Sequence, residues 1–163
     1  MVTKQQIVEF LAAEFPQTKC SVESVGEGSS VIRHKITVEE LRPGGTVAGP
    51  VLMTVADVAL YVALFRKIGI VPLAVTTNLT VNFLRKPAPE KDILGVCKLI
   101  KVGKTLAVGE VLLYSEGNEN PVAHAVGTYS IPAARQPEQS SPNLGSSSTD
   151  DKPRLGVHLG GHS

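Results

Sequence analysis

Asp57 is the residue best suited to chemistry, because it is the only charged residue between Arg42 and Arg66. Its neighbours are mostly valine, leucine and alanine, and a helix that is apolar on nearly all sides is typically buried. Burying an ionised carboxylate costs free energy unless the group is paired or hydrogen-bonded. Asp57 is therefore expected either to accept hydrogen bonds that fix the packing or to take part in a reaction.

A second feature suited to chemistry is the Gly49-Pro50 pair at the expected start of the same helix. Free backbone N–H groups and the positive end of the helix dipole favour a developing negative charge there. A rise of about 1.5 Å per residue separates Gly49 from Asp57 by about 12 Å, too far for both to act on one carbonyl group. If both are catalytic, they belong to different chains of a two-fold dimer with two equivalent sites.

Thr54 and Tyr61 share a helix face with Asp57, since residues three and four positions apart point the same way. These two residues and Pro50 are the candidates on this helix for contacting a substrate. The alternative is structural: Thr54, Tyr61 or a neighbouring strand donates hydrogen bonds to Asp57 that only fix the packing, or Tyr61 is an ordinary core tyrosine.

The surrounding pattern predicts how these residues are held. Thr3 and Gln6 have the form of a capping box at the start of a short N-terminal helix. Extended runs are expected at Cys20–Val25, Ser30–Val38, Ala74–Leu84, Asp92–Val102, Thr105–Ser115 and Pro121–Ile131, with a loop over Glu39–Ala48. Short connections make neighbouring strands antiparallel, so the predicted fold class is α+β, an antiparallel sheet wrapped around one long buried helix.

Length and composition bound the remaining possibilities. The 163 residues predict one domain over residues 1–132, followed by a disordered tail over 133–163 that is rich in Ser, Pro and Gly. A net charge of +1 gives no excess of positive charge that would attract nucleic acid, so a nucleic-acid partner is not expected. The two cysteines lack metal-ligand spacing, so a metal is not expected either. The N-terminus lacks the pattern of a secretory signal, and a carboxylate inside the long apolar helix argues against a membrane span, so we expect a cytoplasmic location.

Three segments resemble a known family. Gly49 to Ala59 is similar to a His-Gly-Gly, spacer, Leu-Ala-Asp-x-Ala signature, Val81 to Pro87 to the strand that follows it, and Gly127 to Ile131 to the last strand. On these segments the chain is identified as a member of the 4-hydroxybenzoyl-CoA thioesterase superfamily, in its phenylacetate-pathway-like branch, with the hotdog fold. The resemblance implies that Asp57 attacks the thioester or activates a water, and that the Gly49 N–H polarises the carbonyl group. It also implies homodimers, often paired into homotetramers, with no cofactor beyond the coenzyme A of the substrate.

The match departs from the family at two positions. Ala48 stands where a histidine is common, and Arg42 stands where relatives carry Asn, Gln or His. Arg42 could pair with Asp57, could orient the acyl group, or could be a solvated loop arginine.

The phosphates of coenzyme A would need cations near the mouth of the pocket. Arg85 and Lys86 are the first candidates, and Asn82 is a further candidate for contacting the substrate. Each of them could equally be a solvated surface residue.

Two functions remain open at this point. The first is hydrolysis of an acyl-CoA thioester to a free acid and coenzyme A. The alternative is a non-catalytic acyl-CoA-binding or regulatory module that uses the same pocket. A hotdog dehydratase or hydratase would need a catalytic histidine in the region of the long helix. This interpretation is disfavoured because no histidine lies between His34 and His124.

Overall fold

The computed structural model describes residues 2–132 except 38, 40, 43–45 and 72, with the side chains of Arg42 and Thr46 also left undescribed. Two helices and eight strands follow in the order α1 (Lys4–Glu14), β1 (Cys20–Gly26), β2 (Ser29–His34), β3 (Leu41–Arg42), β4 (Thr46–Val47), α2 (Gly49–Ile68), β5 (Val75–Phe83), β6 (Ile93–Val102), β7 (Leu106–Ser115) and β8 (Ala123–Ser130). The predicted tail at 133–163 lies outside the described residues.

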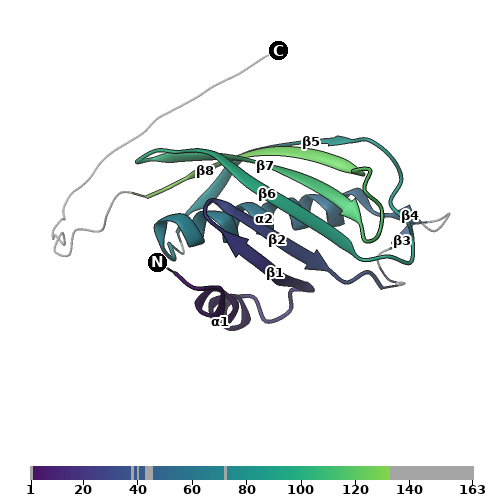
Figure 1. Cartoon of the computed structure of the whole chain (residues 1–163), viewed down its shortest axis with the longest axis horizontal. Coiled ribbons are helices and arrows are strands. Elements are labelled where there is room, and N and C mark those ends of the chain that lie inside the picture. Colours follow the sequence, from purple (N-terminus) through teal and green to yellow (C-terminus); the bar gives the residue numbers. More distant parts are fainter. Residues whose placement is uncertain (1, 38, 40, 43–45, 72, 133–163) are drawn as a thin grey trace, which may run out of the picture. The chain divides into compact units, whose positions relative to one another are not determined.

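Six strands form one antiparallel sheet in the order β1-β2-β6-β7-β8-β5, and α2 packs along one face of it (Figure 1). Helix α1 lies beside β1 and also contacts α2. This arrangement confirms the predicted fold class. None of the helices within the described ranges is both long enough and apolar enough to cross a bilayer.

Both helices begin as the sequence indicates. Thr3 and the side chain of Gln6 cap the start of α1 reciprocally, which confirms the capping box. Helix α2 begins at Gly49 with Pro50 in its first turn and has no side-chain cap at Ala48. It ends at Ile68, and the C-cap residue Gly69 has a positive φ of 99°.

One predicted loop contains regular structure. The strands β3 and β4, within the segment Glu39–Ala48, pair Leu41 with Val47 and Arg42 with Thr46. Two-residue strands are too short for an alternating pattern, so the sequence carried no signal for them. Helix α2 thus starts two residues after a β-strand rather than after an irregular loop.

Glycines in the sheet allow α2 to approach it closely. Gly109 of β7 and Gly127 of β8 are direct partners in the sheet, and both lie under Leu60 of α2. A Cβ atom on Gly127 would lie 2.5 Å from Leu60 Cδ1, and one on Gly109 would lie 2.7 Å from Leu60 Cδ2. Leu60 is 1% exposed and is one helical turn from Asp57, so these glycines set the depth at which the helix carries its carboxylate.

We expect Gly127→Ala to lower the free energy of unfolding by about 1–3 kcal/mol, because the added methyl group overpacks the contact with Leu60. Urea denaturation would measure the change. In a double-mutant cycle, Leu60→Ala should make room for the methyl group, so the double variant should lose less stability than the two single losses combined. Strict additivity would show that Leu60 is not what the methyl group meets.

Candidate active site

Asp57 opens into a cavity of about 430 Å³ whose walls come from both helices and from two strands at one side of the sheet. Thr54 and Tyr61, the two residues predicted to share its helix face, line the same cavity. The remaining lining residues are largely apolar: Leu11, Phe15, Thr18, Val58, Ala74, Val75, Thr76 and Tyr129. The carboxylate is half-buried, so it is reachable from the cavity without being fully solvated.

Two hydroxyl groups hold the Asp57 carboxylate. Thr76 Oγ1 of β5 donates to Asp57 Oδ1 at 2.5 Å, and the Tyr129 hydroxyl of β8 lies 2.8 Å from the same oxygen and 3.0 Å from the Asp57 carbonyl oxygen. Neither donor is Thr54 or Tyr61, and Thr54 instead donates to the Pro50 carbonyl oxygen at 3.1 Å. Within the described part of the chain, no side-chain hydrogen bond is made to Oδ2, so one carboxylate oxygen is held and the other is available.

Thr76 reaches Asp57 because β5 contains a bulge. Simple alternation along the strand would place Thr76 on the same face as Asn78, Thr80 and Asn82. The pairing with β8 shifts register between Thr76 and Asn78, so Thr77 is an extra residue and Thr76 lies opposite Tyr129. The bulge therefore turns Thr76 to the inner face, where Asp57 lies.

Burial keeps Tyr129 protonated. Its pKa is raised well above the ordinary value, mainly by burial and next by the negative charge of Asp57. The pKa of Tyr61 is raised too, by burial first and then by the charges of Glu14 and Asp57. Both phenols therefore remain hydrogen-bond donors at neutral pH, and Tyr129 can hold a carboxylate without itself ionising.

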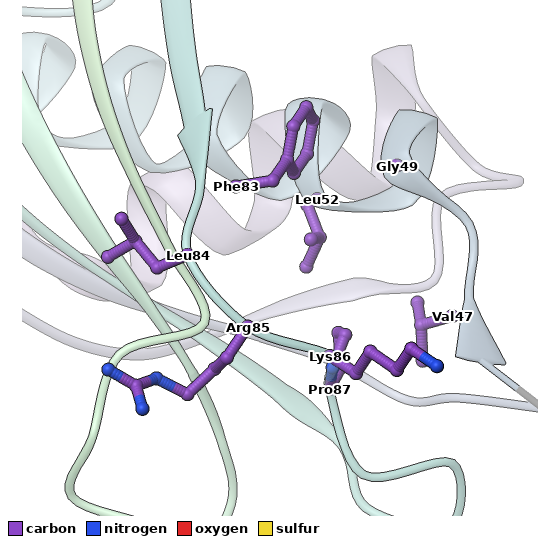
Figure 2. Close-up of a pocket in the computed structure, with 8 residues that line it drawn as sticks. All are labelled: Val47, Gly49, Leu52, Phe83, Leu84, Arg85, Lys86 and Pro87. Carbon is purple, nitrogen blue, oxygen red and sulfur yellow. The ribbon is translucent and has the colours of Figure 1, made fainter.

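A second cavity, of about 350 Å³, surrounds the start of α2 (Figure 2). It is lined by Val47, Gly49, Leu52, Phe83, Leu84, Arg85, Lys86 and Pro87. Figure 2 shows the Phe83 ring beside the helix start, and a Cβ atom on Gly49 would lie 3.4 Å from that ring. No hydrogen bond from the Gly49 N–H to any described residue is found, as expected for the first turn of a helix. In one chain, therefore, Gly49 and Asp57 lie in different cavities.

The sequence profile of the thioesterase superfamily matches residues 44–122. Among solved structures, a candidate thioesterase from a Silicibacter species shares 42% sequence identity at a TM-score of 0.75, and the match covers 81% of this chain and 93% of that one. The chain belongs to the thioesterase superfamily. Its reaction class is thioester hydrolysis, and its architecture is the hotdog fold, as the sequence predicted.

More distant structures share the fold of this thioesterase. Zebrafish thioesterase superfamily member 2 is 22% identical with a TM-score of 0.72, and the match covers 81% of this chain and 100% of that one. A variant of the phenylacetic acid degradation protein PaaI from Thermus thermophilus is 21% identical with a TM-score of 0.62, covering 76% and 99%. No curated protein sequence matches the chain.

Of the other predicted site residues of the thioesterase, some border one of the two cavities and others do not. Arg85 and Lys86 border the Gly49 cavity, and Arg85 Nε donates to the Pro121 carbonyl oxygen at 2.8 Å. Asn82 is exposed and lies opposite His124 in the sheet, on the face away from α2, and borders neither cavity. Pro50 is exposed and lines neither cavity. The Arg42 side chain lies outside the described atoms, so its role stays a prediction.

Hydrogen bonds to Asp57 from a neighbouring strand were one expectation, but the sequence did not identify Thr76 and Tyr129 as the donors. Thr76 was hidden by the bulge, because nothing in the local pattern marks Thr77 as an extra residue. Tyr129 was noticed only as part of the final strand, although a tyrosine on an inward position of a β-strand is a possible partner for a buried acid. No group of three or more His, Cys, Asp or Glu residues with a metal-binding arrangement occurs in the part of the chain that the structure describes.

Proposed function

We propose that the protein hydrolyses acyl-CoA thioesters at two equivalent sites of a homodimer, each combining Asp57 of one subunit with the Gly49 N–H of the other. The observation that carries the proposal is that Asp57 lines a largely apolar cavity while two hydroxyls hold one oxygen of its carboxylate. No described side chain bonds the other oxygen, Oδ2, so this oxygen is available to a thioester or to a water molecule.

The cavity at Gly49 supports the other half of the site. An N–H group without a partner at a helix N-terminus can donate a hydrogen bond to a thioester carbonyl oxygen and stabilise the negative charge that develops on it. Arg85 and Lys86 border the same cavity and are exposed, as groups that bind the phosphates of coenzyme A would be. We therefore place the coenzyme A moiety near Gly49 and the acyl group near Asp57 of the opposite subunit.

Exposed apolar side chains support assembly around this region. Val75 and Phe83 of β5 are each 55% exposed, Leu84 is 50% exposed and Met53 of α2 is 40% exposed. Strand β5 is at the edge of the sheet, and an uncovered apolar edge strand is a surface that proteins normally pair or protect. A two-fold pairing here would cover these residues, and light scattering would distinguish the dimer from the tetramer.

The reaction follows from the charges at the site. As the carbonyl carbon is attacked, negative charge collects on its oxygen and is stabilised by the Gly49 N–H. In one route Asp57 Oδ2 attacks, the C–S bond breaks with release of coenzyme A as thiolate, and water then cleaves the mixed anhydride. In the other route Asp57 takes a proton from a water that attacks directly. Both routes give a free acid and coenzyme A.

Asp57→Asn should lower the rate of thiol release from acyl-CoA substrates by at least about 1000-fold, because an amide neither attacks nor accepts a proton effectively. The measurement is a thiol-release assay over short, long and aromatic acyl-CoAs, with circular dichroism to confirm the fold. Thr80→Val serves as a control, since Thr80 is exposed on β5, lines neither cavity and donates its hydroxyl to Asn78 Oδ1 rather than to Asp57. Binding of acyl-CoA by the wild type without thiol release on any substrate would favour the non-catalytic binding module instead.

A single turnover in ¹⁸O-labelled water separates the two routes. If Asp57 is the nucleophile and water attacks the Asp57 carbon of the anhydride, the label enters the Asp57 carboxylate, and the acid released in that turnover carries the enzyme's unlabelled oxygen. Label in the acid at once results either from a general base or from attack of water on the acyl carbon of the anhydride. Mass spectrometry of the quenched enzyme separates these two cases, because only the anhydride adds the mass of the acyl group to the chain.

A further inference from the structure

Three residues border two separate cavities at the end of α1. Leu11, Phe15 and Thr18 line the Asp57 cavity on one side. The same residues line a cavity of about 540 Å³ on the other, together with Lys4, Gln5, Val8, Ala12, Pro16, Cys20, Ser21 and Val22. The end of α1 and the segment after it therefore form a partition between the site and a second open space.

The residues of this partition differ in how deeply they are buried and how closely they are packed. Leu11 is 7% exposed and belongs to the core, so it anchors α1. Phe15 is 46% exposed and ends the helix, with its N–H donating to the Leu11 carbonyl oxygen. Its ring meets Tyr61 edge-on at 6.1 Å and Phe10 at 6.4 Å. Phe15 is thus a large ring held by a few edge contacts rather than by close packing.

Tyr61 and Tyr129 continue from this ring toward the carboxylate. Their rings stack with centroids 6.0 Å apart, and the Tyr129 hydroxyl bonds Asp57. Along the cavity wall the order is Phe15, Tyr61, Tyr129 and then Asp57. An acyl group whose carbonyl carbon lies at Asp57 would therefore extend along the rings and end at Phe15.

We propose that Phe15 is the specificity-determining residue that limits the length of the acyl group, because its ring separates the Asp57 cavity from the cavity of about 540 Å³ on the other side of the partition. This inference rests on the proposed thioester site. It assigns to the end of α1 a role in substrate choice, whereas the reacting groups, Asp57 and the Gly49 N–H, come from α2. Short and medium acyl chains fit on the Asp57 side, and longer chains are stopped by the Phe15 ring.

Removing the ring should join the two cavities. An alanine at position 15 keeps the backbone N–H that ends α1 and leaves Leu11 in the core, so the helix should stay in place. Each additional methylene that becomes buried should then raise affinity by about fourfold. A tryptophan at the same position should act in the opposite direction and shorten the preferred chain.

The test compares wild type, Phe15→Ala and Phe15→Trp on saturated acyl-CoAs of increasing length, measuring kcat/KM by thiol release. Phe10→Ala is the matched control, because Phe10 contacts the same rings but does not line the Asp57 cavity. We expect Phe15→Ala to move the optimum by two or more methylene groups and Phe10→Ala to leave it in place. An unchanged optimum in Phe15→Ala, or an equal shift in both variants, would overturn the partition.

Binding measurements keep this inference separate from the proposed function. Non-hydrolysable thioether analogues of acyl-CoA, titrated by calorimetry, report chain length without any reaction. If no variant hydrolyses thioesters but Phe15→Ala alone binds longer analogues, the partition stands and the proposed hydrolysis fails. If wild type hydrolyses thioesters and neither assay shows a change in length, the partition fails alone.

Discussion

Equal amounts of Asp57→Asn and Gly49→Pro chains, refolded together, should regain about a quarter of wild-type activity, although each variant alone is inactive. In a mixed dimer one site combines the intact Gly49 of the first chain with the intact Asp57 of the second. The other site combines both substitutions and is dead. Random pairing makes half of the dimers mixed, each with one working site of two. Thiol release at constant total protein, before and after mixing, measures the recovery.

Gly49→Pro suits this experiment because it removes one N–H with little other change. Ala48 has φ −67° and ψ 143°, the extended conformation that a residue before proline favours. A Cβ atom at position 49 would make ordinary contact with Phe83 at 3.4 Å. Proline is also well tolerated in the first turn of a helix.

Gly49→Ala is the matched control, because it adds the same Cβ but keeps the N–H. We expect it to retain most of the activity, which would assign the loss in Gly49→Pro to the missing donor. No recovery on mixing, with mixed dimers demonstrated by mass spectrometry, would refute a site shared between chains. Full activity in Gly49→Pro would remove the N–H from the mechanism.

Tyr129→Phe combined with Thr76→Val should lower kcat by about 100-fold while leaving KM within about threefold, because the Asp57 carboxylate loses both groups that fix its orientation. Neither residue touches the reacting atoms in this scheme, so both are positioning residues. Phenylalanine keeps the ring stacked on Tyr61, and valine keeps the shape of threonine. Steady-state kinetics separate a loss of orientation from a loss of binding.

Thr76→Ser provides the conservative comparison. It retains the hydroxyl that donates to Asp57, so it should keep most of the activity that Thr76→Val loses. A merely structural role would instead make both substitutions follow the stability of the protein, measured by thermal unfolding. Equal kcat in Thr76→Ser and Thr76→Val would show that the hydroxyl is not needed.

Much of the architecture was predictable because it depends on long, regular patterns. The apolar stretch around Asp57 predicted a buried helix, and Gly49-Pro50 predicted its start at the observed residue. Four alternating segments predicted β5 to β8 to within two residues at each end. The shared helix face of Thr54, Asp57 and Tyr61 followed from helical geometry alone, and these three do line one cavity. Their catalytic or binding roles remain predictions.

The partners of Asp57 were not predictable in the same way. Thr76 and Tyr129 are 19 and 72 residues away in the sequence, and their approach depends on strand order and register. Phe15 was not among the candidate site residues, since nothing in the local sequence reveals that cavities lie on both sides of it. Arg42, the largest departure from the family pattern, still has three possible roles.

The bulge at Thr77 makes the pairing register of β5 part of what specifies the site. If β5 kept Thr77 but paired with β8 without the bulge, regular alternation would place Thr76 on the opposite face, with Asn78, Thr80 and Asn82. The hydroxyl that holds Asp57 would then point away from it, although every residue type needed for the site would still be present. When this strand is aligned, grafted or redesigned, the register shift between Thr76 and Asn78 has to be preserved together with the identity of Thr76.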